Sequence, residues 1–122
     1  MSSNWKKYQE NQIKTSNPVQ LTILAYEKCI INVKNAAKML REKKYDEATS
    51  LLKRVEAITM ELKLQLNEEG NEDLVADINR LYDYIIVQVR VMDGAKRDDK
   101  EHTIVEVFSN LLAGYREVLK DA

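Results

Sequence analysis

The sequence predicts an all-α protein: an antiparallel up-down-up-down four-helix bundle that follows a mobile N-terminal segment. The 122 residues contain only three Gly and one Pro, which is too few turn residues for a protein of many strands. Hydrophobic residues make up 44% of the chain and charged residues 32%, enough for one core and a polar surface. Four stretches repeat apolar residues at steps of three and four. The polar links between these stretches are short, which favours antiparallel neighbours.

Residues 1–16 form the predicted mobile segment, and residues 17–122 form the predicted bundle. The segment is polar, yet Tyr8 and Ile13 are large apolar side chains at a spacing that fits no regular element. We interpret them as a detachable cover, two apolar anchors that dock weakly on the bundle and are displaced when a partner binds. The alternative is permanent packing of both side chains against the end of the bundle.

The first predicted helix begins at Asn17-Pro18. Asn can cap a helix, and Pro suits the first helical position because its missing N–H would have no partner there. Cys29 lies beside the core stripe and is expected at the edge of the core. The predicted core stripe consists of Ile23, Tyr26, Ile30, Val33, Ala37 and Leu40.

The second predicted helix is expected to begin at the capping residue Asp46 and to end before Gly70, which lies in the polar loop NEEGNED. A glycine just past the last periodic residue is typical of a helix end. Its predicted core stripe consists of Ala48, Leu51, Val55, Ile58, Leu62 and Leu66.

The third and fourth predicted helices are separated by a second polar link. Gly94 is expected to end the third helix, and Asp98 or Asp99 is expected to cap the fourth. The predicted stripe of the third helix consists of Leu74, Ile78, Leu81, Ile85, Val89 and Met92. That of the fourth consists of Ile104, Phe108, Leu111, Tyr115 and Val118.

Composition and charge exclude several classes of function. A formal net charge of −1 provides no basic surface for nucleic acid. No apolar run is long enough to predict membrane insertion, and the N-terminus lacks the apolar core of a secretory signal. The single cysteine cannot form an internal disulfide, which favours a reducing compartment. We therefore expect a cytoplasmic protein.

The sequence also lacks the usual residues of an active site. His102 is the only histidine and Cys29 the only cysteine, so neither a catalytic Cys–His pair nor a multi-histidine metal site is expected. The three glycines are isolated and form no phosphate-binding loop. We therefore predict no enzyme activity, no metal and no cofactor.

Several large apolar residues fall outside the core stripes and predict a binding surface instead. Met60 and Leu64 lie on the far side of the second helix, and Val75, Tyr82 and Ile86 form a second stripe on the third. Two adjacent helices that expose apolar side chains form a groove suited to an amphipathic partner helix. Two alternatives remain open. The wide stripe on the third helix packs against both neighbours, or the exposed stripes join copies of the chain in a structural homo-oligomer.

The chain resembles the flagellin-specific export chaperone family FliS over nearly its whole length. The resemblance is carried by the N-terminal stretch YQENQIKTSNPVQLTILAYEKCI, by RLYDYI in the third helix and, loosely, by VEVFSNLLAGYREVL in the fourth. Two places depart from the family pattern: Lys28-Cys29, where a small residue is usual, and the link from Met92 to Asp99. The matching positions of the first stretch are Tyr8, Ile13, Thr15-Ser16, Pro18, Gln20-Leu21 and Tyr26-Glu27.

The resemblance implies a cytoplasmic chaperone without a cofactor. It would bind the disordered C-terminal segment of flagellin, prevent premature polymerisation and deliver flagellin to a component of the flagellar export gate. Weak self-association is compatible with the same surfaces. On this hypothesis the client contacts Met60, Leu64, Val75, Tyr82 and Ile86, while Tyr8 and Ile13 cover apolar surface in the empty chaperone.

Overall fold

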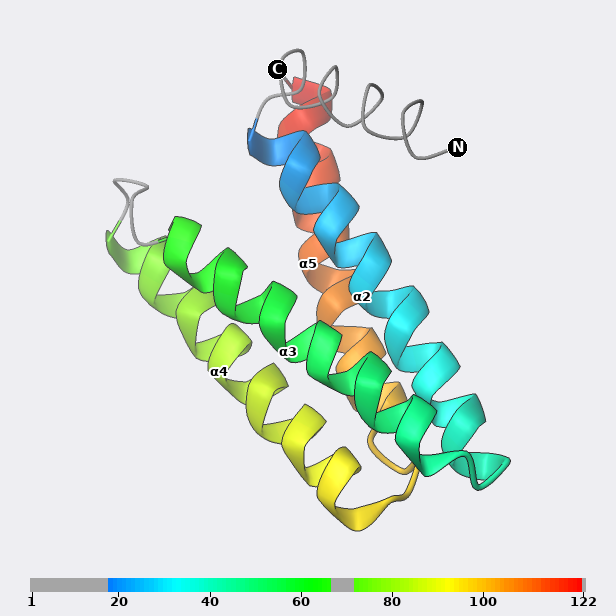
Figure 1. The fold of residues 1–122 in the computed structure, drawn as a ribbon. Helices are drawn as coiled ribbons and strands as arrows, with labels where there is room; N and C mark the ends of the chain where they lie inside the picture. Colours follow the sequence, from blue (N-terminus) through cyan, green and yellow to red (C-terminus); the bar gives the residue numbers. More distant parts are fainter. Residues whose placement is uncertain (1–17, 67–71, 122) are drawn as a thin grey trace, which may run out of the picture.

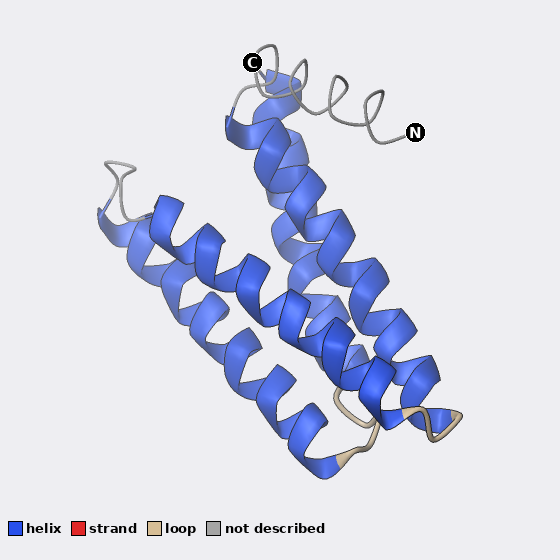
Figure 2. Cartoon of the chain, viewed as in Figure 1, coloured by secondary structure: helices blue, strands red, loops and turns tan. Residues whose placement is uncertain are grey.

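The computed structural model describes residues 18–66 and 72–121. Within these residues the chain is helical except for two short links (Figure 2). The all-α prediction is confirmed. Tyr8, Ile13, Asn17 and Gly70 lie outside the described residues. The four helices are α2 (Pro18–Arg41), α3 (Tyr45–Leu66), α4 (Glu72–Ala95) and α5 (Glu101–Asp121).

The helices form an antiparallel bundle, as predicted (Figure 1). α2 packs extensively against both α3 and α5, and α3 packs against α4, whereas α4 and α5 contact each other much less. The α3–α4 hairpin and the α2–α5 pair lie close together at the end that carries the two short links, and they diverge toward the opposite end (Figure 1). No helix within residues 18–66 and 72–121 is both long and apolar enough to cross a membrane.

All four helices contribute to one apolar core. Its largest fully buried side chains include Tyr26, Tyr82 and Phe108. Burial of each large apolar side chain contributes about 1.5–3 kcal/mol to folding, most of which is offset by chain entropy. Cys29 is fully buried, so it belongs to the core itself rather than to its edge.

The core stripes were predicted best for α2 and less well for α3. On α2, Ile30 is only partly buried and Cys29 and Ala36 are buried instead. On α3, the buried face includes Leu52 and Thr59, so Leu51 and Ile58 lie at the edge of the core. The hydroxyl of Thr59 donates a hydrogen bond to the carbonyl of Val55 at 2.8 Å. This bond satisfies the hydroxyl inside the helix, so a polar residue can face the core.

The ends of the helices differ from the predicted caps. α3 begins at Tyr45, so Asp46 lies in its first turn, where a negative charge is favourable. α4 continues past Gly94 to Ala95, and α5 begins at Glu101, after the carbonyl of Lys100 has accepted the first helical hydrogen bond. The predictions that Asp46, Gly94 and Asp98 or Asp99 mark these ends are therefore wrong by one to three residues.

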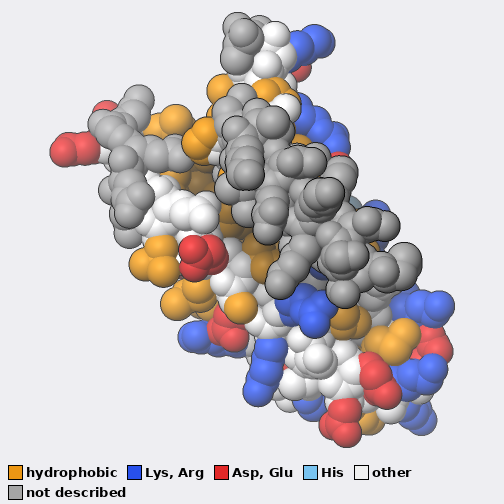
Figure 3. All heavy atoms as spheres, turned by 45° about the horizontal axis from the view of Figure 1, so that its top comes forward, with side chains coloured by type: hydrophobic (Ala, Val, Ile, Leu, Met, Phe, Trp, Pro, Cys, Tyr) orange, Lys and Arg blue, Asp and Glu red, His pale blue; other side chains and the backbone are white. Residues whose placement is uncertain are grey.

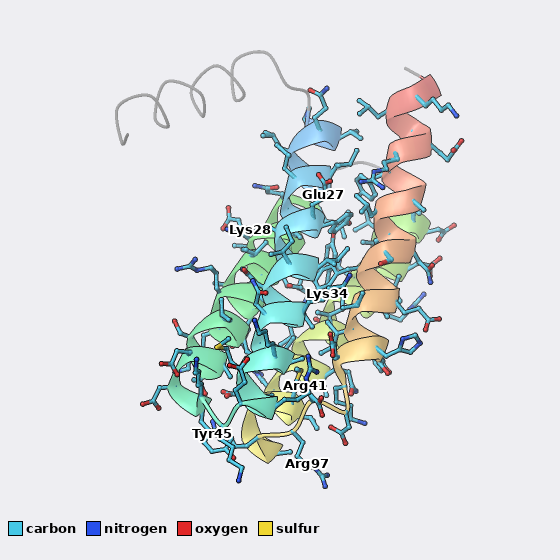
Figure 4. All side chains as sticks on the ribbon, turned by 90° about the vertical axis from the view of Figure 1, so that its right-hand side faces the viewer. Glu27, Lys28, Lys34, Arg41, Tyr45 and Arg97 are labelled. Atoms are coloured by element: carbon cyan, nitrogen blue, oxygen red, sulfur yellow. The ribbon has the colours of Figure 1, made fainter. Side chains whose placement is uncertain are left out.

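The link between α4 and α5, a departure from the family pattern, is defined by two features. Lys96 takes a left-handed φ of 56° and ends α4. The guanidinium of Arg41 at the end of α2 then donates hydrogen bonds to the carboxylates of Asp98 at 2.9 Å and Glu101 at 3.2 Å. Figure 4 shows Arg41 beside this link. The link is thus connected to α2 rather than projecting freely.

The C-terminus of α2 offers a test of backbone strain. Lys43 has a φ of 60°, and the N–H groups of Lys43 and Lys44 bond the carbonyls of Leu40 and Met39, the two bonds of a Schellman motif. Because a left-handed φ strains every residue except glycine, Lys43→Gly should stabilise the fold by about 1 kcal/mol. Urea unfolding followed by circular dichroism measures this change.

The matched control is Lys34→Gly, at an exposed position inside α2 (Figure 4). There glycine should destabilise the fold by about 1 kcal/mol. Equal effects of the two substitutions would contradict the assignment of strain to Lys43.

Candidate functional site

An apolar groove lies between α4 and α5, with a volume of about 490 Å³. α4 contributes one wall and α5 the other, and Val19 of α2 also contributes to the lining. Only two lining residues, Asn110 and Tyr115, carry a polar group in the side chain. The groove is lined by Val19, Leu74, Ile78, Leu81, Val107, Asn110, Leu111, Gly114, Tyr115 and Val118.

The groove exists because α4 and α5 are each held to a different neighbour. Ion pairs connect α3 to α4 through Lys63 and Asp83 at 2.7 Å and through Glu56 and Arg90. On the other side, Arg116 of α5 pairs with Glu27 of α2 at 3.1 Å, and Figure 4 shows Glu27 on the side of α2 that faces α5. Among the described residues, no ion pair joins α4 to α5.

A further polar contact holds the beginning of α3 to the end of α4. The hydroxyl of Thr49 donates to the carboxylate of Asp93 at 2.5 Å, and the ammonium of Lys96 donates to the same carboxylate at 3.1 Å. Burial by itself would raise the pKa of Asp93, but these hydrogen bonds outweigh it and hold the pKa below its ordinary value. The contact therefore stabilises the hairpin at neutral pH, and this contribution is lost as the pH falls through the lowered pKa.

The walls of the groove carry large apolar side chains that water still reaches. On α4, Leu74 is 55% exposed and Leu81 is 38% exposed. On α5, Val118 is exposed as well. Ile78 and Leu111 are buried beneath them. A partner that enters the groove would remove this apolar surface from water, which is favourable in proportion to its area.

The bottom of the groove rests on an aromatic cluster of the core. Tyr115 lines the groove, and its ring packs edge-on against the ring of Tyr26, with 5.4 Å between centroids. Tyr26 also contacts Phe108, and its hydroxyl is hydrogen bonded to the hydroxyl of Tyr82 at 2.6 Å. Burial, reinforced by the neighbouring Tyr82, raises the pKa of Tyr26 far above its ordinary value, so the phenol stays neutral. The cluster joins α2, α4 and α5 under the groove.

The predicted client-binding residues do not form one surface. Met60 and Leu64 are exposed on α3, as predicted, but no residue of α3 lines the groove. Val75 is half-buried against the core. Tyr82 is 1% exposed and Ile86 is 6% exposed, so the prediction that they form an exposed second stripe is wrong.

The physical reason is that this face of α4 packs inward, against the neighbouring helices. The residues that face the groove, Leu74 and Leu81, had been assigned to the core, as had Val118 on α5. α4 carries more apolar residues than one core-facing side of a helix can bury. This excess is the sequence feature that could have identified them. Hydrophobic side chains accordingly reach the surface along the side of the molecule formed by α3 and α4 (Figure 3).

The single cysteine, Cys29, and the single histidine, His102, both lie outside the lining of the groove. Burial raises the pKa of the Cys29 thiol to about 12, with a small opposing effect from a hydrogen bond with Thr59, so the reactive thiolate is scarce at neutral pH. His102 is exposed and lies 3.2 Å from the carboxylate of Glu106 on its own helix. The described residues contain no group of three His, Cys, Asp or Glu side chains that could hold a metal ion.

Comparison with known proteins gives consistent similarities. A family model described as "Flagellar protein FliS" matches residues 1–122. The flagellar secretion chaperone FliS of Bacillus subtilis (strain 168) is 30% identical over 78 residues, which cover 64% of this chain and 57% of that protein. The match thus spans little more than half of this curated relative. A crystal structure of a bacterial flagellar chaperone is similar at a TM-score of 0.83 and 36% identity, covering 99% of this chain and 98% of that one.

Proposed function

The chain belongs to the FliS family of flagellar proteins, and we propose from this membership that it binds the C-terminal segment of flagellin as an export chaperone. In this proposal it acts in the cytoplasm, keeps flagellin from polymerising and delivers it to a component of the flagellar export gate. The family is one of non-enzymatic chaperones, so the function rests on a binding surface rather than on an active site.

The single observation that carries the proposal is the apolar groove between α4 and α5. A segment that is disordered when free can gain affinity by folding into a helix whose apolar face fills such a groove. The exposed Leu74 and Val118 belong to opposite walls of the groove, Leu74 to α4 and Val118 to α5. The groove lies where α5 diverges from α4 (Figure 1), so a helix of the client would take the place that a more closely packed α5 would occupy.

Met60 and Leu64 support a second contact with the client. Both are exposed apolar side chains on the outer face of α3, which the groove does not reach. A disordered client can wrap around a small protein and contact separate surfaces with separate segments. Val75, Tyr82 and Ile86 stay predicted client contacts. Because Tyr82 and Ile86 are buried in the free chain, the client could reach them only if the helices moved apart.

The proposed function is tested by titrating the chain with a peptide of the C-terminal segment of the flagellin encoded in the same genome. We expect saturable binding, with a gain of helical circular dichroism because the peptide folds on the chaperone. A peptide of the same composition in scrambled order serves as the control. No binding up to about 50 µM would overturn the proposal. Sedimentation of the chain alone then shows whether the apolar surfaces join two copies instead.

A further inference from the structure

Gly114 lies inside α5 (Glu101–Asp121), where a glycine is unfavourable. Glycine in a helix interior destabilises the fold relative to alanine, because the unfolded chain has more freedom to lose and no side chain contributes packing. Glycine usually occurs at such a position because the backbone takes a conformation that other residues avoid, or because a neighbouring atom leaves no room for a side chain. Neither condition holds for Gly114 within the described structure.

The backbone at Gly114 is ordinary helix, because none of the described glycines has a positive φ. A Cβ atom built at this position meets no atom of its surroundings within 4 Å. Alanine would therefore fit the free chain without strain. Nothing among the described residues gives a reason for glycine at this position.

The position of Gly114 indicates a role for glycine in binding. The residue lines the groove, together with Leu111 three residues before it and Val118 four residues after it. These three residues share one face of α5. Gly114 is thus a notch between two apolar side chains, and such a notch lets the backbone of another element approach closely.

We propose that Gly114 is the point of closest approach between α5 and a client helix bound in the groove. The inference rests on the proposed function and adds a specificity-determining residue to it. The client backbone passes over the notch, and its apolar side chains pack against Leu111 and Val118 on either side. A methyl group at position 114 would push the client helix away from both walls.

The proposal predicts that stability and binding change in opposite directions. Gly114→Ala should raise the melting temperature of the free chain by about 2–5 °C, because alanine favours the helix and meets no neighbour. The same variant should bind the flagellin peptide about tenfold more weakly, because the added methyl overpacks the interface. Gly114→Leu should bind more weakly still, because its larger side chain occupies more of the groove.

Gly94→Ala is the matched control. Gly94 is also helical, and a Cβ there also meets no atom within 4 Å, but it lies near the end of α4 and outside the groove. This variant should bind the peptide as the wild type does. If the wild type binds and Gly114→Ala binds equally well or more tightly, the inference is overturned while the proposed function stands. If the wild type does not bind, both are overturned.

Discussion

Replacing Leu74 and Leu81 together by Asp should weaken binding of the flagellin peptide by about 100-fold, equivalent to about 3 kcal/mol. Both side chains line one wall of the groove, and both are exposed in the free chain. Burying a carboxylate against apolar surface without a partner is costly, so the client would have to leave this wall. Calorimetric titration measures the change, and circular dichroism of the free variant confirms that it is folded.

Two matched double variants locate the binding surface. Val87→Asp with Val91→Asp places the same two charges on α4, at positions that are 52% and 44% exposed but outside the groove. This pair should leave binding almost unchanged. Met60→Asp with Leu64→Asp tests the second contact on α3. All three double variants lower the net charge equally, so a difference among them reports location. Full binding by the Leu74 and Leu81 variant would show that the groove is not the client site.

Tyr26→Ala should destabilise the fold by about 3–5 kcal/mol, because it removes a fully buried aromatic ring and leaves a cavity. The ring contacts Phe108 and Tyr115, and its hydroxyl is bonded to Tyr82 of the opposite helix pair. Such a loss is a large part of the total stability of a small domain. The midpoint of urea unfolding measures it.

Two further variants separate the contributions of the ring and the hydroxyl. Tyr26→Phe keeps the ring and removes the hydroxyl, with its hydrogen bond to Tyr82, so it should cost about 1–2 kcal/mol. Tyr45→Ala, at an exposed position where α3 begins, should change stability by less than about 0.5 kcal/mol. A Tyr26→Ala variant as stable as Tyr45→Ala would contradict the central position of the aromatic cluster.

The residues that carry the family resemblance have structural roles that the motif alone did not reveal. Tyr26 is the centre of the aromatic cluster, and Glu27 pairs with Arg116 of α5. In RLYDYI, Tyr82 meets Tyr26 in the core, and Asp83 pairs with Lys63 of α3. The described parts of these two motifs therefore hold helices together, whereas most of the groove lining belongs to the third stretch, VEVFSNLLAGYREVL on α5.

The sequence alone determined the number of helices, their approximate limits and their antiparallel order. Helical periodicity is a local property, and the polar links between the stripes are short, so these features follow from the order of residues. The best-predicted core stripe is that of α2, although this helix also exposes Leu24 and Ile31. The ends of α2 and α4 were harder to predict, because Lys43 and Lys96 occupy the left-handed positions where sequence patterns favour glycine.

Only the tertiary structure decided which face of α4 is the core and where the groove lies. Apolar residues occur on several faces of this helix, so periodicity allows more than one stripe. Which face of α4 becomes buried depends on which faces pack against another helix. α3 packs against α4, and the hydroxyl of Tyr26 on α2 is hydrogen bonded to the hydroxyl of Tyr82. Tyr82 and Ile86 are therefore buried. α5 diverges from α4 (Figure 1), so Leu74 and Leu81 stay exposed. These two residues of the expected core stripe belong to the wall of the groove, whereas the other four are buried.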